Sequence, residues 1–356
     1  MNRFWSDTVR NILPYIPGEQ PKDKKYIKLN TNENPYPPSP KVLEAIRQET
    51  GSILRLYPDP EASSLKETLS DFYQVRANEV FVGNGSDEIL AFCFPAFFNA
   101  GDVISFPEIT YSFYPVYADL FGLKCETIAL NRDFTVDLSK FPENVDGILL
   151  ANPNAPTGIA VGLSEIEILL QKHNDKLVII DEAYVDFGAE SAVPLIKNYE
   201  NLLVVQTFSK SRSLAGLRVG FALGNKDLIE ALNRVKNSFN SYTVDRIAQR
   251  AAVAAVRDKE YFTETLNRII KTREETAKRL ISLGFNVLPS KTNFLFVSHD
   301  KISGRELFSR LRHDGILVRH FDREGIENYL RITIGTDEEM EVLVERLQNF
   351  LRNSIP

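Results

Sequence analysis

A lysine and an aspartate each stand directly after an apolar run, where their side chains could do chemistry. Lys210 follows the run at 202–208, and Asp181 follows the run at 177–180. Each run reads as a buried strand. Because an amine and a carboxylate are costly to bury without a partner, their positions indicate a ligand site. The amine can form an imine with an aldehyde, and the carboxylate can pair with a protonated ring nitrogen.

Three further apolar runs end in polar or aromatic groups. Gly85, Ser86 and Asp87 open a predicted helix, whose free amide N–H groups and positive dipole end favour a phosphate. Tyr111 follows the next strand and can stack on a planar ring, and Asn154 follows the strand after that. Ligands of parallel sheets bind beyond the carboxyl ends of the strands. Five such ends together predict one cofactor site.

The cofactor follows from the groups that these residues can bind. A phosphate, a flat ring, a ring nitrogen and an aldehyde together describe pyridoxal 5'-phosphate. Its usual protein partners are a lysine bound to the aldehyde and an acidic residue at the ring nitrogen. The sequence therefore predicts a pyridoxal-phosphate enzyme.

The elements that position these residues are predicted by hydrophobic periodicity. Before residue 240, short apolar strands alternate with helices, which is typical of an α/β fold whose large, mostly parallel sheet is covered by helices on both faces. After it, a long helical region and further strands predict a smaller C-terminal α/β domain. We expect an extended, proline-rich arm at 1–40 that packs with the small domain or a partner subunit, a large cofactor-binding domain at 41–240, and a small domain at 241–356.

Two helix starts carry local signals. A helix is predicted to begin near Ser39, and the last helix near Thr336, where Glu339 three residues on completes a capping box.

Composition limits the class of protein. The 356 residues suffice for one large and one small domain, and 43% hydrophobic with 25% charged residues is ordinary globular composition. The net charge of −6 argues against nucleic acid as a partner. No apolar stretch approaches the roughly 18 residues of a membrane span. Cys93 and Cys125 read as buried free thiols, and the histidines lack metal-ligand spacing. We expect a cytoplasmic protein that binds neither membrane, nucleic acid nor metal.

Three motifs make the chain resemble the class I, fold-type I aminotransferases. They are NPNAPTG at 152–158, DEAY at 181–184 and SKSRSLAGLR at 209–218. One branch of that family, the histidinol-phosphate aminotransferases, is further similar in LNTNENPYPP at 29–38, RLYPDP at 55–60 and YLRITIG at 329–335. The resemblance covers essentially the whole chain in order. It implies a homodimeric, pyridoxal-phosphate-dependent transaminase of histidine biosynthesis, which exchanges an amino group between L-histidinol phosphate and 2-oxoglutarate.

The resemblance also implies roles at the cofactor. Lys210, Asp181 and Tyr184 match the catalytic set: the lysine at the aldehyde, the partner of the ring nitrogen and the tyrosine at the ring hydroxyl. Tyr57 matches a tyrosine that reaches the cofactor phosphate of the neighbouring subunit. The remaining matches are the phosphate-binding and ring-stacking positions Gly85, Ser86, Asp87, Ser209, Arg218 and Tyr111.

Substrate roles follow in the same way. Arg331 matches the arginine that binds the substrate carboxylate, Arg319 its helper, and Tyr15 and Asn32 lie in the arm that closes over substrate. In one place the chain departs from the family. Ala155 precedes Pro156 where the family has an asparagine at the ring hydroxyl. We assign that role to the adjacent Asn154.

Alternative interpretations stay open at this point. Lys210 can be a solvated lysine, Asp181 a helix cap and Arg331 a structural ion-pair partner. Among enzymes, an aromatic amino acid aminotransferase or a phospho-amino-acid decarboxylase would share these motifs. Two alternatives outside the pyridoxal-phosphate enzymes are a cofactor-binding regulator and a nicotinamide enzyme. The negative net charge argues against the regulator, because such proteins bind DNA. The nicotinamide enzyme is disfavoured because FVGNGSDE has Glu88 where the dinucleotide motif ends in glycine.

Overall fold

Seven strands form the sheet of the large domain, in the order β2-β8-β7-β6-β5-β3-β4. They are β2 (Val80–Gly83), β3 (Val103–Pro107), β4 (Lys124–Ile128), β5 (Gly147–Ala151), β6 (Leu177–Asp181), β7 (Leu202–Thr207) and β8 (Gly220–Gly224). Strands β3 to β7 are mutually parallel, and β8 runs antiparallel to both β2 and β7. The expected mostly parallel sheet is confirmed in this computed structural model, which describes residues 3–354.

Helices cover both faces of this sheet, which is why its central strands β5 and β6 are largely apolar. One face packs against α2 (Pro40–Gln48), α3 (Ser63–Tyr73), α6 (Leu163–Lys172) and α8 (Arg246–Arg257). The other packs against α4 (Gly85–Phe97), α5 (Phe113–Phe121) and α7 (Lys226–Phe239). Successive strand residues alternate between the two cores: Val178 and Ile180 belong to the first, and Ile179 to the second.

The small domain has its own antiparallel sheet and its own core. The strand order is β12-β13-β10-β9. The strands are β9 (Phe285–Val287), β10 (Phe294–His299), β12 (Arg319–His320) and β13 (Leu330–Thr333), with helices α10 (Gly304–His313) and α11 (Asp337–Ser354) packed on them. The run at 316–321, which reads as one strand, divides into β11 (Ile316–Leu317) and β12, because the two halves pair with different strands.

The N-terminal arm docks on this small domain. Its strand β1 (Ile27–Lys28) pairs in parallel with β11, and Leu29 enters the small-domain core. The short helix α1 (Asp7–Asn11) buries none of its residues. The arm thus crosses from the small domain toward the large one, which begins with α2.

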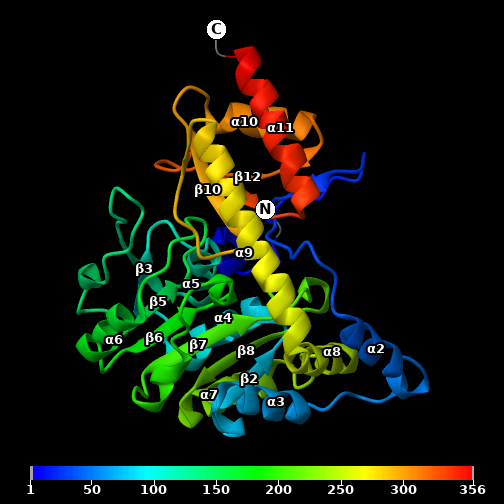
Figure 1. Ribbon diagram of the computed structural model, residues 1–356. Coiled ribbons are helices and arrows are strands. Elements are labelled where there is room, and N and C mark those ends of the chain that lie inside the picture. Colours follow the sequence, from blue (N-terminus) through cyan, green and yellow to red (C-terminus); the bar gives the residue numbers. More distant parts are fainter. Residues whose placement is uncertain (1–2, 355–356) are drawn as a thin grey trace.

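The long helix α9 (Lys259–Ser282) runs from the large domain into the small one, as the yellow ribbon of Figure 1 shows. The helix before it, α8, lies within the core that α2 and α3 share with the large sheet. This packing departs from the expected boundary at 240/241, since residues 246–257 pack with the large domain. We propose that the domain boundary falls within α9.

Local signals fix the helix starts. Ser39 caps α2 by accepting a hydrogen bond from the N–H of Val42. Thr336 and Glu339 make both bonds of the expected capping box before α11.

Short 3-10 helices connect other elements: η1 (Ser52–Arg55), η2 (Ala77–Glu79), η3 (Leu138–Lys140), η4 (Val185–Phe187), η5 (Val193–Lys197) and η6 (Ala215–Leu217).

Two expectations from composition meet the structure here. Cys93 is buried, but Cys125 is exposed, so its prediction as a buried thiol is wrong. It lies on β4, the edge strand of the large sheet, whose first four residues are exposed. Among the described residues, no helix is both long and apolar enough to cross a membrane.

Candidate active site

A cavity opens beyond the carboxyl ends of the central strands. The last residues of β5, β6 and β7, which are Ala151, Asp181 and Thr207, stand in its wall. The arm and the small domain complete it from the other side. The sequence-predicted residues that line it are Tyr15, Asn32, Ser86, Asp87, Tyr111, Asp181, Tyr184, Ser209, Lys210, Arg218, Arg319 and Arg331.

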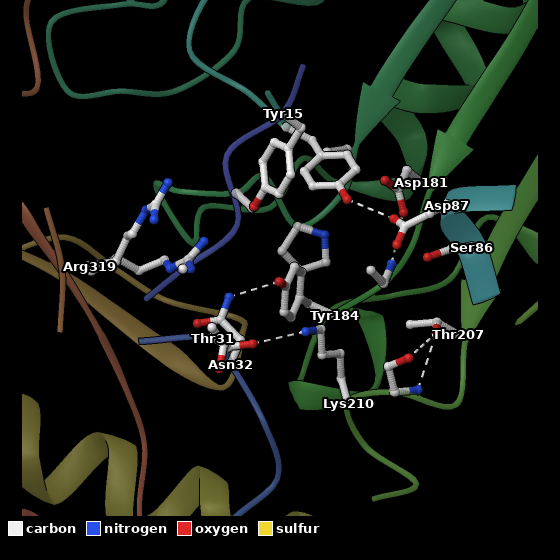
Figure 2. A pocket seen from close by; sticks show the side chains of 18 of the residues that line it. Tyr15, Thr31, Asn32, Ser86, Asp87, Asp181, Tyr184, Thr207, Lys210 and Arg319 are labelled. Carbon is white, nitrogen blue, oxygen red and sulfur yellow. Dashed lines mark hydrogen bonds between the residues drawn. The ribbon is translucent and has the colours of Figure 1, made fainter. Parts of the chain in front are cut away.

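Lys210 reaches into this cavity from the loop after β7. Its Nζ donates to the carbonyl oxygen of Thr31 at 3.2 Å (Figure 2). The Asn34 amide donates to the carbonyls of Lys210 and Ser211, so the arm also fixes the lysine backbone. Across residues 3–354 no carboxylate pairs with Lys210. The amine therefore contacts two neutral groups at the cavity, the Thr31 carbonyl and the Tyr184 ring, whose centroid lies 5.8 Å from Nζ.

Asp181 is 6% exposed and accepts two hydrogen bonds. The hydroxyl of Tyr114 donates to Oδ2 at 3.1 Å, and the N–H of Ala183 donates to Oδ1 at 3.2 Å. Burial nevertheless raises the pKa of Asp181 to about 6. A cationic group in the cavity would relieve this cost, because it would give the buried carboxylate a charge partner.

Tyr114 has no role in the sequence interpretation, although a signal for it exists. It stands on the first turn of α5, three residues after Tyr111, which lies two residues before the helix. The two rings contact edge to face at 5.6 Å. Thr207, two residues before Ser209, was missed in the same way and donates to its hydroxyl oxygen at 3.0 Å.

The N-terminus of α4 and Arg218 form the opposite end of the cavity. Gly85 has φ +79°, and a Cβ there would lie 2.6 Å from Nη2 of Arg218. A Cβ on Gly220 would lie 2.5 Å from the amide nitrogen of Ser86. Glycine at both positions lets the guanidinium and β8 approach the helix end, where N–H groups and the dipole favour an anion. Gly85 does not line the cavity; it makes room for Arg218.

A hydrogen-bonded network joins this end to the ring wall. Arg218 donates to Ser209 Oγ at 3.1 Å and to the Asp87 carboxylate at 3.0 Å. Tyr111 donates to the other oxygen of Asp87 at 2.7 Å. Burial first, and the Asp87 charge second, raise the pKa of Tyr111 well above its ordinary value. Tyr111 is therefore a neutral, oriented aromatic wall.

Two guanidinium groups face the cavity from the small domain. Arg331 donates to the carbonyl of Asn30 at 3.0 Å, and its buried Nε has no hydrogen-bond partner among the described residues. Arg319 contacts the carbonyls of Ile16 and Pro17 at 3.3 and 3.5 Å. Burial lowers the pKa of Arg331. In the part of the chain that the structure describes, neither arginine has a carboxylate partner, so together they form a site for an anion.

Besides Gly85, two predicted residues do not reach the cavity. Asn154 is buried, and its Nδ2 donates to the Ile109 carbonyl and to Thr157, while its Oδ1 accepts from Thr110. These bonds turn its side chain away, and Ala155 lines the cavity instead. Tyr57 is 76% exposed and stacks on Tyr242 at 4.6 Å, outside the cavity of its own chain.

The donor set fits pyridoxal phosphate. An anion cradle, an aromatic wall, a buried carboxylate and an amine stand around one cavity, which are the partners of its phosphate, ring, ring nitrogen and aldehyde. Within residues 3–354, no group of three His, Cys, Asp or Glu side chains is arranged to hold a metal ion.

Comparison with known proteins gives a consistent result. The model of the family "aminotransferase class I and II" matches residues 24–347. The chain is 54% identical over 354 residues to a histidinol-phosphate aminotransferase of Clostridium beijerinckii, covering 99% of both chains. It is 56% identical over 348 residues to the enzyme of the same name from Clostridium acetobutylicum, covering 98% of this chain and 99% of that one.

A solved structure is similar along the whole chain. It is the histidinol-phosphate aminotransferase of Sinorhizobium meliloti in complex with pyridoxal 5'-phosphate, with a TM-score of 0.91 and 27% identity over 99% of both chains.

Proposed function

We propose that this chain, which belongs to the family of class I and II aminotransferases, transfers an amino group reversibly between L-histidinol phosphate and 2-oxoglutarate. The products are imidazole acetol phosphate and glutamate, in a step of histidine biosynthesis. The observation that carries this proposal is the half-buried Arg331 guanidinium, which has no carboxylate partner among the described residues and lines the same cavity as Lys210. An amine donor with an anionic end fits that pair.

The chain's residues divide the work of holding the cofactor. The α4 N-terminus, Ser209 and Arg218 would hold the phosphate, Tyr111 the ring face, and Asp181 the ring nitrogen. Pyridoxal phosphate, when bound, supplies an aldehyde that condenses with amines and a ring that accepts electrons from the substrate carbon.

Lys210 moves the proton in this reaction. Once its amine is free, Nζ would take the proton from the substrate Cα as a general base. It would then deliver that proton to C4′ of the cofactor as a general acid. Thr31 orients this amine through its carbonyl oxygen. Asp181, held by Tyr114 and Ala183, keeps a negative charge beside the ring nitrogen and so favours its protonated form.

The two arginines bind substrates of different shape in turn. One substrate carries a phosphate ester and the other two carboxylates, and the planar guanidinium forks of Arg331 and Arg319 suit both anions. Tyr15 stacks on Phe113 at 4.4 Å and lines the cavity, so the arm excludes water from the reacting groups.

We also propose that the enzyme is a homodimer in the cytoplasm. Tyr57 stacks on Tyr242, both side chains are exposed, and a second copy of this chain would cover the pair. This placement supports a role for Tyr57 at the cofactor phosphate of the neighbouring subunit. The two free thiols, Cys93 and Cys125, suit a reducing compartment.

A substrate panel tests the proposal. Purified enzyme is assayed for amino transfer to 2-oxoglutarate from histidinol phosphate, phenylalanine and threonine phosphate. We expect histidinol phosphate to give the highest kcat/KM. A faster reaction with phenylalanine would indicate an aromatic aminotransferase, and loss of carbon dioxide from threonine phosphate a decarboxylase. Borohydride reduction should attach a pyridoxyl group to Lys210 in the wild type and none in Lys210→Ala.

A further inference from the structure

Asn32 is held in an unusual backbone conformation by three hydrogen bonds. It is 1% exposed and has φ 57°, in the left-handed region. Its N–H donates to Oγ1 of Thr333 at 3.0 Å, and its carbonyl accepts from the Asn293 amide at 2.9 Å. Its Oδ1 accepts from the Thr333 hydroxyl at 3.0 Å. Residues held so firmly in sparsely populated conformations are typical of functional sites.

These bonds fix the direction of the next one. The Thr333 hydroxyl accepts the Asn32 N–H, so it donates its own proton to Oδ1, and the amide orientation follows. Nδ2 must then donate to the Tyr184 hydroxyl oxygen, 2.8 Å away (Figure 2). Because the Tyr184 oxygen accepts this bond, its O–H proton is free to be donated into the cavity that Tyr184 lines.

At residues 154–155 the cavity wall offers no side-chain donor. Ala155 carries a methyl group there, and the amide of Asn154 is engaged with Ile109, Thr157 and Thr110. An acceptor beside Tyr184, such as the ring oxygen of the cofactor, therefore depends on the Tyr184 proton.

We propose that Asn32 is a positioning residue that fixes Tyr184 as a hydrogen-bond donor to the ring oxygen of the cofactor, at a wall where Ala155 supplies no polar group. The inference rests on the proposed function and assigns to Asn32 a role at the cofactor in place of one at the substrate. Thr333 fixes the orientation of Asn32, because its hydroxyl accepts from the Asn32 N–H and donates to the Asn32 Oδ1.

The same arm segment contacts three groups of the site. The carbonyl of Asn30 accepts from Arg331, that of Thr31 from Lys210, and the amide of Asn32 donates to Tyr184. Three consecutive residues thus hold the anion-binding, amine and hydroxyl groups in one relative arrangement.

The decisive variant is Asn32→Asp. Aspartate tolerates the left-handed conformation, but its carboxylate only accepts hydrogen bonds, so it would take the Tyr184 proton away from the cavity. The readout is the pH midpoint of the visible absorption band of the cofactor-loaded protein. A donor to the ring oxygen favours its negative form, so losing it should raise the midpoint by about 1 to 2 units. Cofactor affinity, titrated with pyridoxal phosphate, should fall about tenfold or more.

Three comparisons separate positioning from other effects. Tyr184→Phe should raise the midpoint equally, and Thr333→Val, which adds no charge, should add nothing in the Tyr184→Phe background. Thr333→Ser keeps the hydroxyl and should behave as wild type, whereas Thr333→Val removes it and should raise the midpoint without adding charge. If Asn32→Asp lowers the melting temperature of the cofactor-free protein so far that it does not fold, the two Thr333 variants still test the inference.

The outcomes are distinct from those of the proposed function. If the wild type shows no visible band and no borohydride label at Lys210, the proposed function fails. If the wild type shows both, the inference is overturned by a Thr333→Val shift that persists in the Tyr184→Phe background. Equal midpoints for Thr333→Val and Thr333→Ser would overturn it as well.

Discussion

Replacing Asp181 with asparagine should stabilise the cofactor-free protein and weaken cofactor binding. Burial raises the pKa of this carboxyl to about 6, from 3.8 for an ordinary aspartate. Between these values the folded state holds a proton that the unfolded state has lost, so stability falls as pH rises through the interval. At about 1.36 kcal/mol per unit, the wild type carries a cost of about 3 kcal/mol above pH 6, and none below pH 4.

Asparagine removes this cost without creating an unpaired group. Its Oδ1 can still accept from the N–H of Ala183, and the Tyr114 hydroxyl can turn to accept from Nδ2. The assay is urea denaturation of cofactor-free wild type and Asp181→Asn from pH 4 to pH 8. We expect the free energy of unfolding of the variant to exceed that of the wild type by an amount that grows from pH 4 to pH 6. The difference should reach about 3 kcal/mol and stay constant at higher pH.

Tyr114→Phe is the matched comparison. It removes one donor to the carboxylate, so it should raise the pKa of Asp181 further and extend the pH-dependent loss by about one unit. With cofactor bound, the order reverses: Asp181→Asn should bind pyridoxal phosphate about 10- to 100-fold more weakly, because a charge-assisted bond is lost. The reasoning would be refuted if, with rising pH, the free energy of unfolding of the wild type increased relative to that of Asp181→Asn.

Three other predictions concern separate parts of the site. Arg331→Gln should lower kcat/KM about 10- to 150-fold for both the phosphate and the dicarboxylate substrate, and Arg331→Lys should recover only part; an unchanged value for glutamate would contradict an anion site. Tyr57→Phe should reduce cofactor affinity several-fold while leaving the melting temperature of the cofactor-free protein unchanged, since the side chain is exposed; equal cofactor affinity in the two proteins would remove Tyr57 from the site. Gly85→Ala should weaken cofactor binding and destabilise the protein by about 1 kcal/mol or more, because φ is positive and Arg218 lies where the methyl group would go; a melting temperature equal to that of wild type would argue against this crowding.

The sequence by itself determined the elements and most of the cavity wall. Apolar runs with both faces buried predict parallel strands, and the residues just beyond them reach one edge because the strands share a direction. The caps at Ser39 and Thr336 depend on neighbours three residues away, so they too can be read locally. These features need no knowledge of distant contacts.

The tertiary structure decided which way individual side chains point. Asn154 is adjacent in sequence to the expected position, but hydrogen bonds to Ile109 and Thr110, some 45 residues away, turn it inward. Asn32 obtains its orientation from Thr333, 301 residues along the chain. The stacking of Tyr57 on Tyr242, 185 residues along the chain, likewise arises only in the folded structure. Such contacts join distant segments, so no local pattern of residues encodes them.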